Sequence, residues 1–303
     1  MFLFGANRKK ERIPTDPLHS KVLLWKKSKN LNEISSEILC GFSGAARSDI
    51  GCVRSNNEDN YVFGKYMNHD SAEHSEIACS FPKVSGEWHF AGVFDGMGGG
   101  EMGELAAHDT AEIFLKAFDG LTESQSKTEV DLILRKAFLE ANNRIVSLQK
   151  EYKIFGTTGT VLCTNGAEFK IYHLGDSRAY LVHEDELIQI TKDQTLAQMK
   201  MEVGMYREDD PSVEADKHKL TEYIGRDWTK ENLKPVESRW LSVRRNDRIL
   251  LCSDGLYDMC ADDVISGILR KNTSVAEIAS ELVNTAKANG GEDNITCVVI
   301  LFS

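Results

Sequence analysis

The stretch TGTVLCTNGAEFKIYHLG, residues 158–175, carries the pattern that decides the fold. Two runs rich in apolar and β-branched residues flank Asn165-Gly166, a dipeptide that favours the tight turn of a β-hairpin. Strands joined by so short a turn pair in antiparallel order, so the stretch predicts antiparallel sheets with helices packed outside them. The elements of the chain do not alternate strictly between strand and helix, the pattern that would indicate a parallel sheet.

Three further apolar runs predict strands covered on both faces, because their apolar residues are almost continuous. They are EWHFAGVF (87–94), DRILLCSD (247–254) and NITCVVILF (294–302). Amphipathic periodicity predicts helices at about 101–118, at 127–150 and at about 275–288. The last of these follows a Thr-Ser start and ends at Asn289-Gly290-Gly291, a typical helix stop.

Composition limits the kinds of partner and compartment. The 303 residues carry a formal net charge of −11, which argues against nucleic acid as the main partner because binding to its backbone requires a basic surface. No apolar run approaches the roughly 20 residues of a membrane helix, so we expect no membrane association and a cytoplasmic location. The seven cysteines are isolated, which indicates buried thiols rather than a zinc site or disulfides. The sequence carries no signal for an oligomeric state.

Residues 1–42 differ from the rest of the chain in charge and pattern. Residues 1–45 contain eight Lys or Arg against four Asp or Glu, and no hydrophobic period is sustained there. Two interpretations stand side by side: a loosely attached extension, or an arm that docks or regulates. Residues 43–303, with short strands, turns and helices, are predicted to form one folded domain.

Four aspartates occupy one kind of position, at the end of a buried strand or just before its start. They are Asp95 in VFDGMGG, Asp176 in YHLGDSRAY, Asp254 in LLCSDGLYD and Asp293 in GGEDNITCVV. For a single Asp-Gly pair, a tight turn is the simpler interpretation. Four converging carboxylates would repel one another unless a cation lay between them, and oxygen ligands favour Mg²⁺ or Mn²⁺. The recurrence of one setting therefore predicts a metal site.

A second polar cluster lies in RSDIGCVRSNNEDNYVFG, residues 47–64. Taken alone, this run is typical of a surface loop. Arg54, however, precedes the pair Glu58-Asp59 by four residues, and its guanidinium can offer two parallel hydrogen bonds to a phosphate.

The glycines after Asp95 permit a different interpretation. Gly98, Gly100 and Gly103 have the spacing G-x-G-x-x-G, which between a strand and a helix is the dinucleotide-binding fingerprint. Asp119 lies near the position expected for a ribose-binding acid. This interpretation places Asp95 beside a pyrophosphate with no cation between them, and it explains none of the other three aspartates.

Six motifs in order give the chain a resemblance to the metal-dependent Ser/Thr protein phosphatases of the 2C type, in their bacterial form. The motifs, spread over residues 43–302, are RSDIGCVRSNNEDN, VFDGMGGGEMGELAA, GTTGTVLC, HLGDSRAYL, LLCSDGLYD and GGEDNITCVVI. The resemblance implies an α+β fold in which two antiparallel β-sheets form a central sandwich flanked by helices on both sides. It also implies phosphorylated proteins as substrates, the targets of a Ser/Thr kinase.

The resemblance assigns roles to the acidic residues and the arginine. It implies that Asp95 bridges two Mn²⁺ or Mg²⁺ ions, that the Gly96 carbonyl adds a ligand, and that Asp254 and Asp293 hold the second ion. Glu58 and Asp59 would hold metal-bound waters, Arg54 would bind the substrate phosphate, and Asp176 would serve a weaker third ion. Two ions lower the pKa of a bridging water and neutralise phosphoryl oxygens during in-line attack, so no covalent phosphoenzyme is needed.

One departure from the family pattern concerns the proton donor. Animal members carry a histidine directly after the Asp-Gly of the second motif, whereas this chain has Met97, which cannot donate a proton. Bacterial members often have this methionine. His173 lies in a matched motif but is interpreted as a strand residue. Two alternatives to a protein phosphatase remain: a catalytically silent regulatory or binding module of the same fold, and a phosphomonoesterase for small molecules.

The segment from 193 to 225, which we call the flap, corresponds to the part of the family fold beside the active site. It is polar and contains methionines, whose side chains adapt to varied surfaces. We therefore hypothesise that the flap selects substrates.

Overall fold

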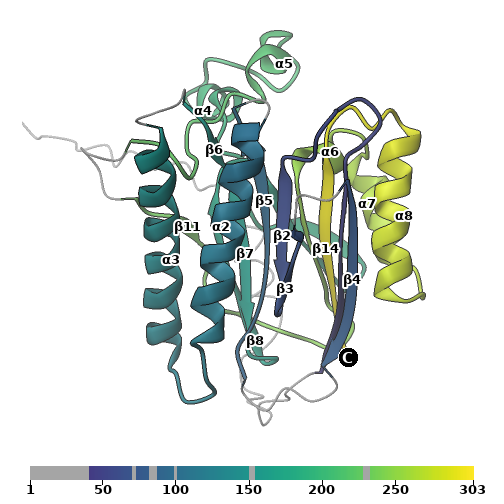
Figure 1. Ribbon diagram of the computed structural model, residues 1–303. Coiled ribbons are helices and arrows are strands. Elements are labelled where there is room, and N and C mark those ends of the chain that lie inside the picture. Colours follow the sequence, from purple (N-terminus) through teal and green to yellow (C-terminus); the bar gives the residue numbers. More distant parts are fainter. Residues whose placement is uncertain (1–40, 70–72, 82–86, 99–100, 150–153, 228–232) are drawn as a thin grey trace, which may run out of the picture. The chain divides into compact units, whose positions relative to one another are not determined.

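Two antiparallel β-sheets lie face to face, and helices cover the outer face of each sheet (Figure 1). The computed structural model describes residues 41–303 except 70–72, 82–86, 99–100, 150–153 and 228–232. The predicted extension, 1–42, lies outside the described residues apart from its last two positions. The fold class predicted above is confirmed, and all strand pairs among the described residues are antiparallel.

The first sheet has six strands in the order β10-β9-β13-β14-β1-β4. Their bounds are β1 (Phe42–Asp49), β4 (His74–Phe81), β9 (Arg178–His183), β10 (Glu186–Gln189), β13 (Arg248–Cys252) and β14 (Ile295–Phe302). Strand β14 is buried along almost its whole length, as its continuous apolar run predicts.

The second sheet has eight strands, with the main order β11-β8-β7-β5-β2-β3, while β12 pairs with β8 and β6 with β5. Their bounds are β2 (Asp59–Phe63), β3 (Tyr66–Met67), β5 (His89–Met97), β6 (Gly156–Thr157), β7 (Gly159–Thr164), β8 (Glu168–Leu174), β11 (Val236–Glu237) and β12 (Leu241–Ser242). The predicted hairpin forms β7 and β8. In its turn Gly166 has a φ of 80°, and the Asn165 side chain accepts hydrogen bonds from the backbone N–H groups of Ala167 and Glu168.

Helices α2 (Glu101–Asp119) and α3 (Lys127–Leu148) cover the second sheet, and α7 (Asp262–Leu269) and α8 (Val275–Ala288) cover the first (Figure 1). The three predicted helices are confirmed. The shorter helices are α4 (Leu196–Glu202), α5 (Ser212–Asp216) and α6 (Asp254–Tyr257). Capping boxes start α3, at Ser126 with Glu129, and α8, at Ser274 with Glu277, so each helix start has its free backbone N–H groups partly satisfied.

Aromatic side chains fix α2 and α3 on their sheet. The Phe114 ring of α2 lies 5.3 Å from the Phe94 ring of β5 and meets the Phe138 ring of α3 edge to face at 4.9 Å. The two sheets also approach each other closely, because a Cβ added at Gly44 of β1 would lie 2.4 Å from the Phe63 ring of β2. Such close packing holds the strand ends in fixed positions.

Strand direction brings several strand ends to one end of the sandwich. Antiparallel pairing places Asp59, the first residue of β2, directly opposite Asp95 near the end of β5. In the first sheet Cys252, the last residue of β13, lies opposite Cys297 near the start of β14. Residues that follow β13 and precede β14 therefore meet at the same end.

Three other sequence predictions can be compared with the structure. All three strands that pair with β5 run antiparallel to it, so the glycine-rich stretch does not belong to the parallel sheet of a dinucleotide-binding fold. Among the described residues, no helix is long and apolar enough to cross a lipid bilayer. Four of the six described cysteines are buried, which agrees with the expectation of buried thiols.

Candidate active site

A cavity of about 490 Å³ opens at the end of the sandwich where these strand ends meet. Seven of the eight residues assigned to the site from sequence line it: Arg54, Glu58, Asp95, Gly96, Asp176, Asp254 and Asp293. They come from the β1–β2 loop, the end of β5, the β8–β9 loop, the start of α6 and the residues before β14. Residues far apart in the sequence thus converge on one cavity.

Asp95 is held by backbone and hydroxyl contacts. Its N–H donates to the Thr158 Oγ1 at 3.0 Å, and its carbonyl oxygen accepts from the Thr157 hydroxyl at 2.9 Å. Burial raises the pKa of the Asp95 carboxyl well above its ordinary value, and the charges of Asp254 and Asp59 raise it further. The carboxyl therefore stands in a negative environment that the protein itself does not compensate.

Asp59 does not line the cavity but lies opposite Asp95 in the pairing of β2 with β5. It is 2% exposed, and its carboxylate accepts a hydrogen bond of 2.7 Å from the Ser253 hydroxyl. Burial raises the pKa of Asp59 to about 7, although the Ser253 hydrogen bond acts in the opposite direction. Asp59 is thus bonded to Ser253, the residue that directly precedes Asp254.

Arg54 and Asp293 form an ion pair at the rim. Burial raises the pKa of Asp293, and the nearby Asp254 adds to this effect. Burial lowers the pKa of Arg54, but the carboxylates of Asp293, Glu58 and Asp254 together more than offset that change and leave the pKa above its ordinary value. With its side chain 46% exposed, the Arg54 guanidinium is open to an anion entering the cavity.

Close backbone contact explains two of the glycines beside the site. A Cβ added at Gly96 would lie 2.3 Å from the Gly103 carbonyl oxygen and 2.5 Å from that of Glu58. A Cβ at Gly103, in the first turn of α2, would lie 2.0 Å from the Glu58 Oε2. The Glu58 carboxylate therefore lies against the N-terminal end of α2, where the helix dipole favours negative charge.

Asp176 is carried by the β8–β9 loop. Its backbone carbonyl accepts a 3.2 Å hydrogen bond from the Tyr257 hydroxyl, and the Arg178 guanidinium stacks 3.6 Å from the centre of the Tyr257 ring. Arg178 in turn pairs with Asp193 at 2.7 Å. Burial raises the pKa of the Asp176 carboxyl well above its ordinary value, and Asp254 raises it further.

The donor set fits a pair of hard divalent cations. Carboxylate and carbonyl oxygens are the ligands that Mg²⁺ and Mn²⁺ prefer. Among the described residues that line the cavity, Arg54 and His218 are the only side chains able to carry positive charge. Because several buried carboxylates face so little compensating charge, a divalent cation would relieve their repulsion.

Sequence reasoning did not assign four polar residues that line this cavity: Thr158, His218, Asp258 and Glu292. His218 lies in the flap, outside every matched motif, so no local pattern marks it. Asp258 does lie in a quoted motif, four residues after Asp254, and helical spacing puts both on one face of α6.

Met97 lines the cavity. His173 is 2% exposed in β8 and is bonded to the Thr160 hydroxyl and a backbone carbonyl, which confirms its interpretation as a strand residue.

The comparisons with known proteins agree on one protein family. The family model of protein phosphatase 2C matches residues 51–201 and 235–295. The serine/threonine protein phosphatase PstP of Mycobacterium tuberculosis is 33% identical over 258 residues, which are 84% of this chain and 44% of PstP. The serine/threonine phosphatase Stp of Listeria welshimeri is 29% identical over 257 residues, which are 84% of this chain and 93% of Stp. The chain thus spans less than half the length of PstP and nearly all of Stp.

A solved structure agrees with these relatives. The catalytic domain of PstP in complex with two manganese ions superposes with a TM-score of 0.66 at 30% sequence identity, and the match covers 86% of this chain and 99% of that domain.

Proposed function

Because the chain belongs to the protein phosphatase 2C family, we propose that it is a metal-dependent phosphatase acting on phosphoserine and phosphothreonine in proteins. Its relatives PstP and Stp are named as serine/threonine phosphatases. The observation that carries the proposal is the convergence of Arg54 and the carboxylates of Asp95, Asp254 and Asp293 on one cavity. An arginine beside a cluster of uncompensated carboxylates fits a phosphate held between a guanidinium and divalent cations.

In this proposal Asp95, the Gly96 carbonyl, Asp254 and Asp293 hold two divalent ions, Mn²⁺ or Mg²⁺. The related PstP domain was solved with two manganese ions. When bound, such a pair of ions lowers the pKa of water and neutralises charge on phosphoryl oxygens. The close contact at Gly96 leaves its carbonyl in a fixed place, since neighbouring backbone allows no side chain there.

The remaining residues orient water and substrate. Glu58, fixed against α2, and the buried Asp59 are proposed to accept hydrogen bonds from waters around the ions. Arg54 is proposed to bind the phosphate. Its guanidinium already contacts the Asp293 carboxylate, so a phosphate that enters the cavity meets a group that is both charged and oriented.

The experiment measures phosphate release from a phosphothreonine peptide with Mn²⁺, with EDTA, and with the Asp95→Asn variant. Activity that requires both the ion and Asp95 would support the proposal. Comparison of kcat/KM for phosphopeptides and small phosphomonoesters separates a protein phosphatase from a small-molecule phosphatase. A folded protein that binds Mn²⁺ but releases no phosphate under any condition would be a regulatory module instead.

The flap is proposed to select among phosphoproteins, the substrates of a Ser/Thr kinase. Its residues His218 and Leu220 line the cavity. Three apolar side chains of the flap, Met199, Val203 and Met205, are exposed to solvent. Replacement of the flap by that of Stp should change the order of preference among phosphopeptides. An unchanged order would contradict this role.

A further inference from the structure

A second cavity, of about 370 Å³, lies at the end of the first sheet opposite the candidate active site. Four arginines line it: Arg244, Arg245, Arg248 and Arg270. His183 ends β9 and Arg248 begins β13, whereas Asp176 and Asp254 lie beyond the other ends of these two strands. The strands have six and five residues, which span about 17–20 Å. The two cavities are therefore separated by the length of the sheet.

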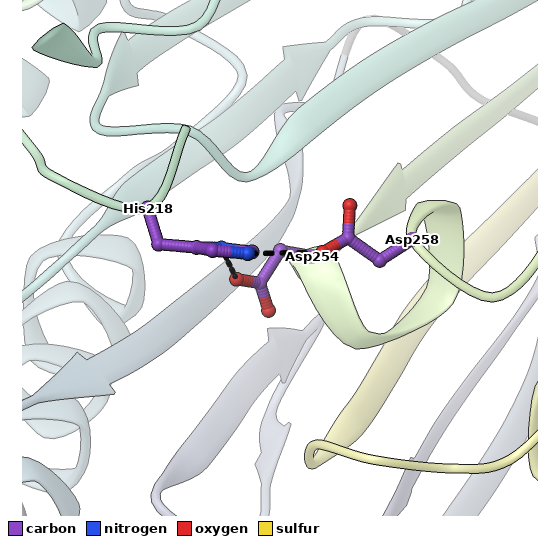
Figure 2. A group of neighbouring side chains, drawn as sticks. All are labelled: His218, Asp254 and Asp258. Atoms are coloured by element: carbon purple, nitrogen blue, oxygen red, sulfur yellow. Dashed lines mark ion pairs between the residues drawn. The ribbon is translucent and has the colours of Figure 1, made fainter. Parts of the chain in front are cut away.

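The charge of this second cavity, which we call the arginine cavity, is opposite to that of the candidate active site. In the active site carboxylates predominate, and His218 faces those of Asp254 and Asp258 (Figure 2). The arginine cavity is lined by four arginines and three carboxylates, those of Glu184, Asp185 and Asp247. A local excess of positive charge in a chain with 36 Lys or Arg and 47 Asp or Glu favours an anionic ligand.

Two of the three carboxylates already contact other groups of the cavity. The Asp247 carboxylate is buried, with its Oδ1 2.6 Å from the His183 Nδ1, and its Oδ2 accepts a 2.8 Å hydrogen bond from the Arg244 N–H. The Glu184 carboxylate forms an ion pair of 3.0 Å with the Arg244 guanidinium. Only the Asp185 carboxylate is left to balance the other three guanidiniums.

Those three guanidiniums have no carboxylate in direct contact within the part of the chain that the structure describes. Arg248 donates to the Leu269 carbonyl, and Arg270 donates to the Ser266 and Asp185 carbonyls at 3.3 and 3.4 Å. The buried Nε of Arg248 has no acceptor among the described residues. Burial lowers the pKa of Arg248, although the charge of Asp185 acts in the opposite direction. An anion in the cavity would supply both the missing charge and an acceptor.

A structural role accounts for only part of this arrangement. The carbonyls of Ser266 and Leu269 belong to the last turn of α7, where the helix dipole favours positive charge. That end of a helix carries about half an elementary negative charge, so it does not neutralise the guanidiniums of both Arg248 and Arg270. It also leaves Arg245 unexplained, since no contact with α7 holds that side chain in the cavity.

Backbone contacts hold the turn that carries Arg245. The Asn246 N–H donates to the Phe302 carbonyl at 2.8 Å, and the Phe302 N–H donates to the Asp247 carbonyl at 3.0 Å. The turn is thus attached to the end of β14, near the C-terminus marked in Figure 1. Asn246 has a φ of 69°, a left-handed conformation that asparagine tolerates better than most residues. A turn fixed in this way loses little conformational freedom when a ligand binds.

We propose that Arg245, Arg248 and Arg270 form a binding site for a phosphate dianion, carried by a phosphorylated residue of a protein or free as inorganic phosphate. Guanidinium groups match phosphoryl oxygens with pairs of parallel hydrogen bonds. Three guanidiniums against the one carboxylate of Asp185 leave two positive charges, close to the charge that a phosphate ester carries at neutral pH.

This site differs from the catalytic one in its chemistry. Asp95, Asp254 and Asp293, the carboxylates proposed to hold the metal ions, line the other cavity. A phosphorylated residue bound at the arginine cavity is therefore retained without hydrolysis. The inference goes beyond the proposed function, because binding at this site does not require the chain to be a phosphatase.

The test is fluorescence anisotropy of a labelled phosphothreonine peptide added to the full chain in EDTA at low salt. Without divalent ions the proposed hydrolysis does not proceed, and the carboxylates of the catalytic cavity repel a phosphate. The phosphopeptide should bind, and Arg245→Gln and Arg248→Gln should each weaken binding at least about tenfold. Competition then separates the two sources: inorganic phosphate that displaces the label as well as unlabelled phosphopeptide identifies the free ion as the ligand, and weaker displacement identifies the phosphorylated residue.

Two control variants separate this site from general charge effects. Arg239→Gln removes the same charge at an exposed position between β11 and β12, on the second sheet. Arg54→Gln removes the arginine of the catalytic cavity. Both should bind the phosphopeptide in EDTA as tightly as the wild type. Arg245 is itself exposed, so Arg245→Gln should leave the fold intact even if replacement of the half-buried Arg248 disturbs it.

Three results would overturn the inference. The first is the absence of phosphopeptide binding to the wild type. The second is binding that is lost in Arg54→Gln or Arg239→Gln but kept in Arg245→Gln. The third is equally tight binding of a peptide with glutamate in place of phosphothreonine, which would mean that the cavity does not recognise phosphate. All three are measured without turnover, so they are distinct from a failure of the Mn²⁺-dependent phosphate release that tests the proposed function.

Discussion

Replacement of Asp254 by asparagine should make the metal-free protein more stable while it removes most of the activity. Asp254 raises the pKa of five neighbouring carboxyls, those of Asp59, Asp95, Asp176, Asp258 and Asp293. In each case it adds to the effect of burial, so these groups experience its charge as repulsion. The asparagine side chain has nearly the same size and shape as that of aspartate, so the substitution removes the charge and little else.

The magnitude follows from Coulomb's law. Two unit charges about 6 Å apart repel by about 3 kcal/mol at an effective dielectric constant of about 20. Neighbours that already hold a proton contribute less, and loss of the half-exposed ion pair with His218 costs at most about 1 kcal/mol. A net gain of about 1 to 3 kcal/mol in unfolding free energy is therefore expected in EDTA. At about 2–4 °C per kcal/mol, the midpoint of thermal unfolding should rise by roughly 2–12 °C.

The assay is urea unfolding of both proteins in EDTA and again with Mn²⁺, together with phosphate release. Ligand binding to the folded state raises the free energy of unfolding by RT ln(1 + [L]/Kd). Because Asp254→Asn should bind Mn²⁺ more weakly, Mn²⁺ should stabilise the wild type more than the variant. Activity should fall by orders of magnitude. Asp209→Asn is the control, because that side chain is 82% exposed and its loss should change stability by less than about 0.5 kcal/mol. An Asp254→Asn protein that is less stable in EDTA, or that keeps near-normal Mn²⁺-dependent activity, would refute the reasoning.

Three further predictions concern the supports of the site and its pH response. Gly103→Ala places a methyl group 2.0 Å from the Glu58 carboxylate, so urea unfolding should show a loss of about 1–3 kcal/mol; an unchanged midpoint would mean that Glu58 moves aside freely. Ser253→Ala removes the 2.7 Å hydrogen bond to buried Asp59, with an expected loss of about 1.5–3 kcal/mol by the same assay; a near-neutral result would show that another donor replaces the hydroxyl. Burial lowers the pKa of His173 from 6.5 to about 4, so folding favours the neutral imidazole. Its contribution to the free energy of unfolding is complete above pH 6.5 and is lost as the pH falls toward 4, a change of about 3 kcal/mol in all. A His173→Gln variant that loses stability as steeply as the wild type over that range would assign the effect to other groups.

The sequence sufficed for most of the fold because the signals involved are local. Asn165-Gly166 specifies a turn from two residues, and the continuous apolar run of residues 294–302 specifies a strand buried on both faces. The capping box at Ser274 and the glycines after Asn289 mark the two ends of α8. Each signal lies within a few residues of the structure it determines.

The candidate site was predictable where its residues lie at strand ends, and it was not where the contact joins distant loops. A carboxylate after a buried strand has its position fixed by the sheet, so Asp95 and Asp254 could be placed from their own neighbours. His218 is placed by the pairing of Leu220 with Thr195, which brings the flap back across the cavity. No pattern in the residues around 218 encodes that return, so its approach to Asp254 is visible only in the folded chain.

The same antiparallel order explains why the acidic residues lie together at all. Where two strands pair in opposite directions, the end of one lies beside the start of the next, so Asp95 at the end of β5 meets Asp59 at the start of β2. Hydrophobic packing of the strands forces the two carboxyls together at a cost that burial increases. The folded domain therefore holds carboxylates whose electrostatic repulsion a cation would relieve, and in the proposed function the strand packing that forms the core also supplies the affinity for metal.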